Sequence, residues 1–85
     1  MNPVLGTVLL FAGDYAPVGW LACDGALLPV WENVPLFQAI GNAYGGDGRT
    51  TFALPNLPSP LEAGGLYIIA AAGSQALAQV EEGYS

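Results

Sequence analysis

The residues that could carry chemistry in this chain gather in one glycine-rich segment, residues 41–57, with the sequence GNAYGGDGRTTFALPNL. Asp47 stands among glycines there, and such a setting can suggest calcium, but calcium takes several oxygen ligands and usually more than one carboxylate. The segment offers a single carboxylate, with Thr50, Thr51 and backbone carbonyls beside it. We therefore predict no metal site, and a turn in which the Asp47 side chain bonds nearby backbone N–H groups.

Arg49 is the only cationic side chain of the chain, which has seven acidic residues. Its planar guanidinium suits a carboxylate or carbonyls, either of the same chain or of a neighbouring one. Asp14, Asp24 and Asp47 are the candidate partners within this sequence. We expect a buried Arg49 to be paired, and the substitution Arg49→Ala to destabilise the loop and any assembly that depends on it.

The same segment is predicted to be a structured loop. A disordered linker would lack large apolar groups, whereas this segment contains two aromatic side chains and two leucines that can anchor it. Its glycines permit positive φ angles and the close approach of other backbone. The residues expected to define the loop are Tyr44, Gly45, Gly46, Asp47, Gly48, Arg49, Phe52 and Pro55.

The sequence offers few groups for catalysis. It contains no histidine and no lysine, no serine in a nucleophile-elbow setting, and only scattered carboxylates. The glycines at 45, 46 and 48 do not form a P-loop, because that pattern ends in Gly-Lys-Ser/Thr before a helix. One cysteine without histidine also cannot build the usual zinc site. We predict a protein that is not an enzyme and has no cofactor.

The composition predicts association with other chains. Charged residues make up 9 % of the sequence and apolar residues 53 %, against roughly 25 % charged residues in an ordinary soluble domain. Much of a monomer's surface would be apolar, which usually marks a protein partner or a membrane. No apolar run is long enough for a membrane span, so self-association is the favoured interpretation. The net charge of −6 argues against nucleic acid.

Two features bear on the compartment. Cys23 is the only cysteine, so no intrachain disulfide is possible; an intermolecular bridge remains open, although a buried free thiol is more common. Residues 1–17 lack a cationic n-region, and the apolar run 8–12 is too short for a signal peptide. We therefore expect either that the general export route is not used or that the sequence is already processed.

The elements that must position the loop are predicted in the order two or three strands, one short helix, the loop and a late strand, which is an α+β domain richer in β structure. The unbroken apolar run 8–11 suggests a strand that is covered on both faces. Asp24-Gly25 is one of the stronger hairpin-turn signals. Strands are expected over residues 4–12, 20–23 and 66–72, with an extended surface connection over 57–65.

Residues 32–41 carry the clearest helix signature. Asn33 can cap the N-terminus, Pro35 is tolerated in the first turn, and Gly41 suits the end. A helix of about two turns is not stable alone. Its apolar face, which must therefore dock on the sheet, consists of Leu36, Phe37 and Ile40.

The chain resembles the phage tail collar domain family, which is found in tail fibre proteins and in small bacterial proteins labelled microcystin-dependent. The resembling residues follow the family's order and spacing from Gly6 to about Leu57. They are Gly6-Thr7, Phe11-Ala12-Gly13, Ala16-Pro17, Gly19-Trp20, Cys23-Asp24-Gly25, Leu28-Pro29, Leu36-Phe37, Ile40-Gly41 and the run 44–57.

Two departures limit what the resemblance implies. Residues 56–60, NLPSP, stand where family members usually have Asp-Leu-Arg-Gly-Arg, and the later region that often carries Ser-His-Thr-His is absent. Residues 66–70 resemble the closing strand of the longer members, as though the intervening region had been shortened to a connector. Metal binding by histidines and receptor recognition by the missing region therefore do not carry over.

Together these features predict a single domain over residues 1–85, with a core over 4–72 and a possible docking tail over 73–85. We expect a structural subunit that self-assembles into a homo-oligomer or filament of an extracellular or phage-tail-like appendage, or of a virion. The alternative is a module of a tail fibre or injection apparatus that binds a cell-surface receptor or glycan. The candidate interface residues are Trp20, Trp31, Tyr67, Ile69, Leu77 and Val80, and residues 1–5 and 73–85 are the segments expected to reach into a neighbour.

Overall fold

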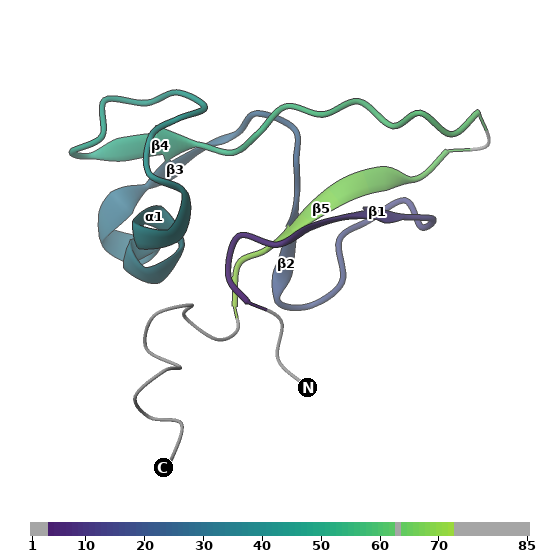
Figure 1. Ribbon diagram of the computed structural model, residues 1–85, viewed down its shortest axis with the longest axis horizontal. Helices are drawn as coiled ribbons and strands as arrows, with labels where there is room; N and C mark the ends of the chain where they lie inside the picture. Colours follow the sequence, from purple (N-terminus) through teal and green to yellow (C-terminus); the bar gives the residue numbers. More distant parts are fainter. Residues whose placement is uncertain (1–3, 63, 73–85) are drawn as a thin grey trace, which may run out of the picture.

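Two separate antiparallel sheets make up the computed structural model, which describes residues 4–62 and 64–72 (Figure 1). One sheet has three strands in the order β1-β5-β2, so the last described strand lies between the first two. The other sheet pairs β3 with β4. The strands are β1 (Val8–Phe11), β2 (Trp20–Ala22), β3 (Leu27–Pro29), β4 (Thr51–Ala53) and β5 (Leu66–Ala70).

The predicted helix is confirmed as α1 (Val34–Ile40), which is slightly shorter than expected and has Pro35 in its first turn as predicted. A 3-10 turn, η1 (Val30–Glu32), precedes it. Asn33 occupies the N-cap position, but its side chain does not cap α1. Instead its amide nitrogen donates to the carbonyl of Pro29 at 3.0 Å, which ties η1 to the end of β3.

One hydrophobic core joins both sheets and the helix. The predicted docking face of α1 is confirmed, because Leu36 is buried and both Phe37 and Ile40 pack against the core cluster. The rings of Phe37 and Phe52 lie 5.3 Å apart between centroids, in a tilted arrangement, which is a favourable geometry for aromatic pairs. The buried members of this cluster are Cys23, Leu36, Phe52, Leu54 and Ile69.

The Asp24-Gly25 pair does not form the predicted hairpin. β2 pairs with β5 and β3 pairs with β4, so the pair forms a corner at which the chain passes from one sheet to the other. Gly25 has a φ of 81° and its N–H donates to the carbonyl of Pro55 at 3.1 Å, while Asp24 forms an isolated bridge with Asn56. Pairing with distant strands, and not the local Asp-Gly signal, therefore determines what this segment connects.

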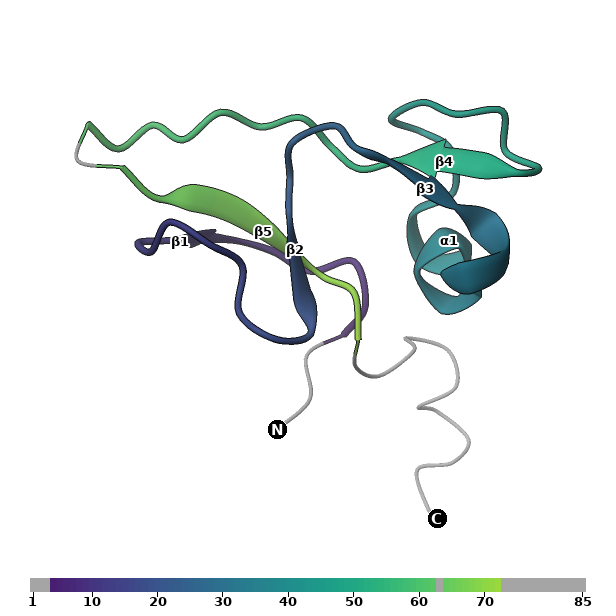
Figure 2. The ribbon, with the colours of Figure 1, turned by 180° about the vertical axis from the view of Figure 1, so that it is seen from behind.

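The connection between β4 and β5 is extended, as predicted. In both views it leaves β4 beside α1, runs along one side of the molecule and turns back into β5 at the other end (Figures 1 and 2). Near its start the connection passes the end of β2, where the Leu57 N–H donates to the Cys23 carbonyl at 2.9 Å. This route places β5 between β1 and β2, at the end of the molecule away from α1.

The first strand differs from its prediction. The expected coverage of both faces is wrong, since Val8, Leu9 and Leu10 are 37 %, 48 % and 42 % exposed. β1 is an edge strand, bonded only to β5, and the described part of the chain does not extend over it. An apolar run without alternation therefore indicated apolar surface here, not burial within one chain.

Gly46 lies where the loop crosses the backbone of β4. Its φ is 88°, and a Cβ built on it would lie 2.4 Å from the Cα of Phe52 and 2.6 Å from the Thr51 carbonyl oxygen. Neither neighbour is the flexible end of a side chain, so the clash cannot be relieved by a rotamer change. The loop therefore requires glycine at this position.

We predict that Gly46→Ala lowers the free energy of unfolding by more than about 2 kcal/mol, because overpacking adds to the cost of a positive φ. Gly41→Ala is the matched control, since Gly41 has a φ of 62° but no atom lies within 4 Å of the position that a Cβ would take there. It should cost only the backbone strain of a positive φ, about 1–3 kcal/mol, and therefore less than Gly46→Ala, to which the clash adds. Urea unfolding followed by tryptophan fluorescence measures both, and equal losses would contradict the close approach.

Candidate functional site

Asp47 organises the exposed end of the glycine-rich loop. Its Oδ1 accepts hydrogen bonds from the backbone N–H groups of Arg49, Thr50 and Thr51 at 2.8, 2.8 and 3.0 Å. Its Oδ2 accepts one from the Thr50 hydroxyl at 2.8 Å. The predicted turn is therefore confirmed, and the carboxylate closes it by satisfying three successive backbone donors.

These bonds also set the charge state of the loop. They hold the pKa of Asp47 well below its usual range, through the backbone N–H of Thr51 first, then that of Arg49, and then the Thr50 hydroxyl and N–H. Hydrogen bonds to the ionised form favour it over the neutral acid. Both carboxylate oxygens are engaged within the loop, and the described ranges contain no group of three metal-ligating side chains.

The loop is fixed to β4 on its other side. The Ala53 N–H donates to the Gly45 carbonyl at 3.0 Å, and the Gly48 N–H donates to the Thr51 carbonyl at 2.9 Å. Phe52, between these contacts, is fully buried, and Pro55 just beyond β4 is buried as well. The loop is therefore held by its backbone and by side chains that follow it, while Tyr44 stays exposed.

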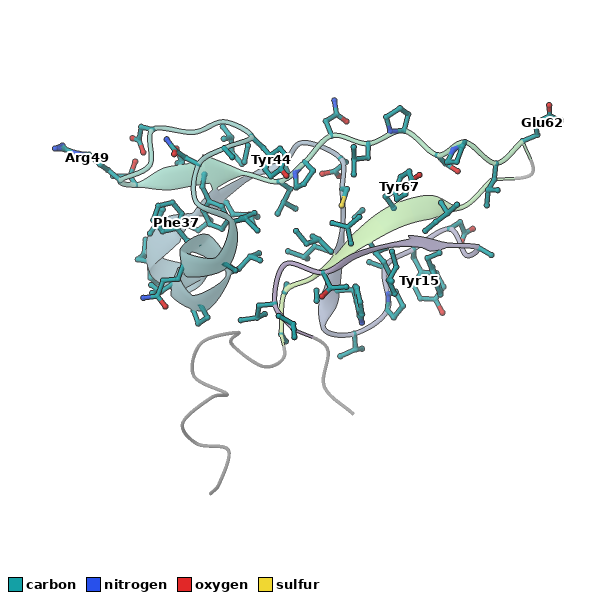
Figure 3. The ribbon with its side chains drawn as sticks, viewed as in Figure 1. Tyr15, Phe37, Tyr44, Arg49, Glu62 and Tyr67 are labelled. Carbon is teal, nitrogen blue, oxygen red and sulfur yellow. The ribbon has the colours of Figure 1, made fainter. Side chains whose placement is uncertain are left out.

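Arg49 does not form the ion pair expected for it. Its side chain is exposed and extends away from the ribbon at the end of the loop (Figure 3), and no carboxylate of residues 4–62 and 64–72 lies within ion-pair distance of it. The only contact of Arg49 with Asp47 is through its backbone N–H. The expected destabilisation of the loop by Arg49→Ala therefore has no support within one chain.

The candidate interface residues occupy different environments. Trp31, on η1, is 74 % exposed, whereas Ile69 is 1 % exposed and belongs to the core, so Ile69 is not available to another chain. Trp20 is half-buried, and Tyr67 is half-buried and packs against the core. Leu77 and Val80 lie outside the described residues. Of the six candidates, Trp31 alone is described as a largely exposed side chain.

The structure shows which large apolar side chains are exposed, and most of them were not among the candidate interface residues. Val8, Leu9 and Leu10 form an exposed apolar strand, and other large side chains are exposed on loops, on β3 and on the first turn of α1. The signal was present in the composition, which predicted apolar surface without locating it. The further exposed side chains are Val4, Tyr15, Val18, Leu27, Val34, Leu57 and Leu61.

A scan of protein-family models matches residues 6–60 to the phage tail collar domain. The matched region contains β1 to β4, α1 and the Asp47 loop. The chain belongs to the phage tail collar domain family. Membership in this family identifies the chain as a phage-tail-type component with a structural role. The family match gives no evidence of a catalytic activity.

The other comparisons add no relative, since no curated protein and no solved structure matches the collar chain.

The longest regular helix of the described residues is α1, with seven residues. Within that part of the chain, the length and hydropathy needed for a membrane-spanning helix are not reached.

We predict that Asp47→Ala lowers the melting temperature, because three backbone N–H groups and one hydroxyl lose their acceptor. Arg49→Ala is the control two residues away, and it should leave the melting temperature of the isolated chain unchanged because only its backbone makes a contact. Thermal unfolding by circular dichroism at neutral pH measures both. A loss for Arg49→Ala as large as that for Asp47→Ala would contradict this account of the loop.

The depressed pKa of Asp47 also predicts a pH dependence. A carboxylate with a lower pKa in the folded state stabilises it fully above the unfolded value of about 3.9, and this contribution fades as the pH falls below that value. The difference in melting temperature between the wild type and Asp47→Ala should therefore be constant from pH 7 to about pH 5 and shrink towards pH 2. A difference that grows on acidification would show that the sign is wrong.

Proposed function

We propose that this collar domain is a structural subunit that assembles with copies of itself into an oligomer or filament of a phage-tail-like appendage or virion. The proposal rests most on one observation, the amount of exposed apolar surface on a chain with few charges. It gives the collar domain a structural role and no catalytic one.

The exposed apolar side chains support this function. They lie on β1, on the β1–β2 loop, on η1 and on the start of α1, so no single small contact would cover them. Small domains gain little stability from their own core, and burial between subunits adds to it. With one cation against seven acids, such contacts must be mostly apolar or formed by backbone.

Receptor or glycan binding is the alternative function, and it has less support. A glycan platform needs exposed aromatic side chains close together, with polar partners. Tyr15 and Tyr44 are both exposed but lie well apart (Figure 3), and Trp31 lies on η1, next to α1, whereas Tyr15 lies on the β1–β2 loop. Tyr15 therefore does not share one binding surface with Tyr44 or Trp31.

Size-exclusion chromatography with light scattering, and negative-stain microscopy of the largest species, test the proposed function on the full chain. We expect a defined oligomer or filaments at micromolar concentration. Trp31→Ser should shift the distribution to smaller species, whereas Tyr44→Ser, which removes an exposed aromatic side chain that lies outside β1, the β1–β2 loop, η1 and α1, should not. An 8.7 kDa monomer at all concentrations would overturn self-assembly and direct attention to receptors and glycans.

A further inference from the structure

β1 presents an open hydrogen-bonding edge. The backbone groups of Thr7 and Ala70 face each other, because the Ala70 N–H donates to the Thr7 carbonyl at 2.9 Å. Successive residues of a strand direct their N–H and C=O groups to opposite sides. Leu9 and Phe11 therefore face β5, as Thr7 does, while the N–H and C=O groups of Val8 and Leu10 face away from it.

The other side of the sheet agrees with this assignment. The Cys23 N–H donates to the Tyr67 carbonyl at 2.9 Å, so Tyr67 and Ile69 direct their backbone groups to β2. Tyr67 is opposite Leu10 and Ile69 is opposite Val8 in the register of β1 with β5. Neither Val8 nor Leu10 is a partner in any other backbone hydrogen bond of the described residues. Four backbone groups are thus without a partner among residues 4–62 and 64–72 and can bind a strand.

This edge lacks the features that keep edge strands apart. Natural sheets protect their edges with charged residues, proline or bulges. β1 has the sequence VLLF, without charge or proline, and its four residues pair with β5 one to one. The arrangement of two residues, Gly6 and Thr7, opposite the single residue Ala70 lies before the strand begins. Val8, Leu9 and Leu10 are exposed on both faces of the strand, so a partner strand would cover apolar side chains on both sides.

We propose that β1 is a homotypic interface, on which the β1 strand of a second copy adds antiparallel to form one continuous six-stranded sheet. The sequence fits itself, because the partner must be apolar, uncharged and able to offer two outward N–H and two outward C=O groups. β2, the opposite edge, has three residues against the four of β1. This inference rests on the proposed self-assembly and names one of its contacts.

The backbone directions limit the register. Outward-facing residues must meet outward-facing residues, and the register that engages both Val8 and Leu10 of each copy pairs Val8 with Leu10 of the second copy and Leu10 with Val8, which forms four hydrogen bonds. Leu9 then lies on the two-fold axis, opposite Leu9 of the second copy, as a non-hydrogen-bonded pair. Such pairs have Cα atoms about 4.5 Å apart, within the range that a disulfide spans.

Cysteine cross-linking tests this register on the full chain. Leu9→Cys should form a disulfide-linked dimer on mild oxidation. Val8→Cys is the matched control on the same strand, because the two Val8 positions are offset along the strand by two residues and lie more than about 7 Å apart, too far for a disulfide. The native thiol should not compete, since burial, with the charge of Asp24, raises the pKa of Cys23.

The outcomes separate this contact from the proposed function. A dimer formed by Leu9→Cys and not by Val8→Cys, on a folded chain by circular dichroism, supports the homotypic strand pair. An oligomeric wild type in which Leu9→Cys forms no dimer, or in which both variants cross-link equally, overturns the strand pair and leaves self-assembly intact. A monomeric wild type overturns both.

Discussion

The buried cluster around Phe52 is the contact on which the rest of the structure depends. The two-stranded sheet is too small to fold alone, because an isolated pair of strands is only marginally stable in water. Phe52 and Leu54 bring β4 and its continuation against Leu36 of α1 and Ile69 of β5. This one core serves both sheets and the helix, and within the described residues no element covers the apolar side chains of β1.

The Asp47 loop follows from the same cluster. Phe52 is buried directly after the turn that Asp47 closes, and Gly46 lets the loop pass against the Phe52 backbone. The core thus holds one end of the loop, while the carboxylate orders the other end without help from a second charged side chain. As a result Arg49, the only cation of the sequence, forms no ion pair with the described residues and extends away from the loop (Figure 3).

Local signals were sufficient for part of the fold and of the site. The spacing of Leu36, Phe37 and Ile40, with Pro35 in the first turn, predicted α1, and the position of Asp47 among glycines predicted its turn. Pairings between distant strands were not predictable in this way, so Asp24-Gly25 was assigned to a hairpin instead of a corner between sheets. Composition gave the amount of apolar surface, but whether Val8 to Leu10 are covered depends on which strands lie beside them.

The central claim is that one chain leaves apolar surface and strand edges that other copies cover. If so, folding and assembly are linked, and stability depends on protein concentration. The most direct measurement is the melting temperature of the full chain at total concentrations from about 1 to 100 μM. The account predicts a melting temperature that rises steadily over this range, and a melting temperature independent of concentration would contradict it.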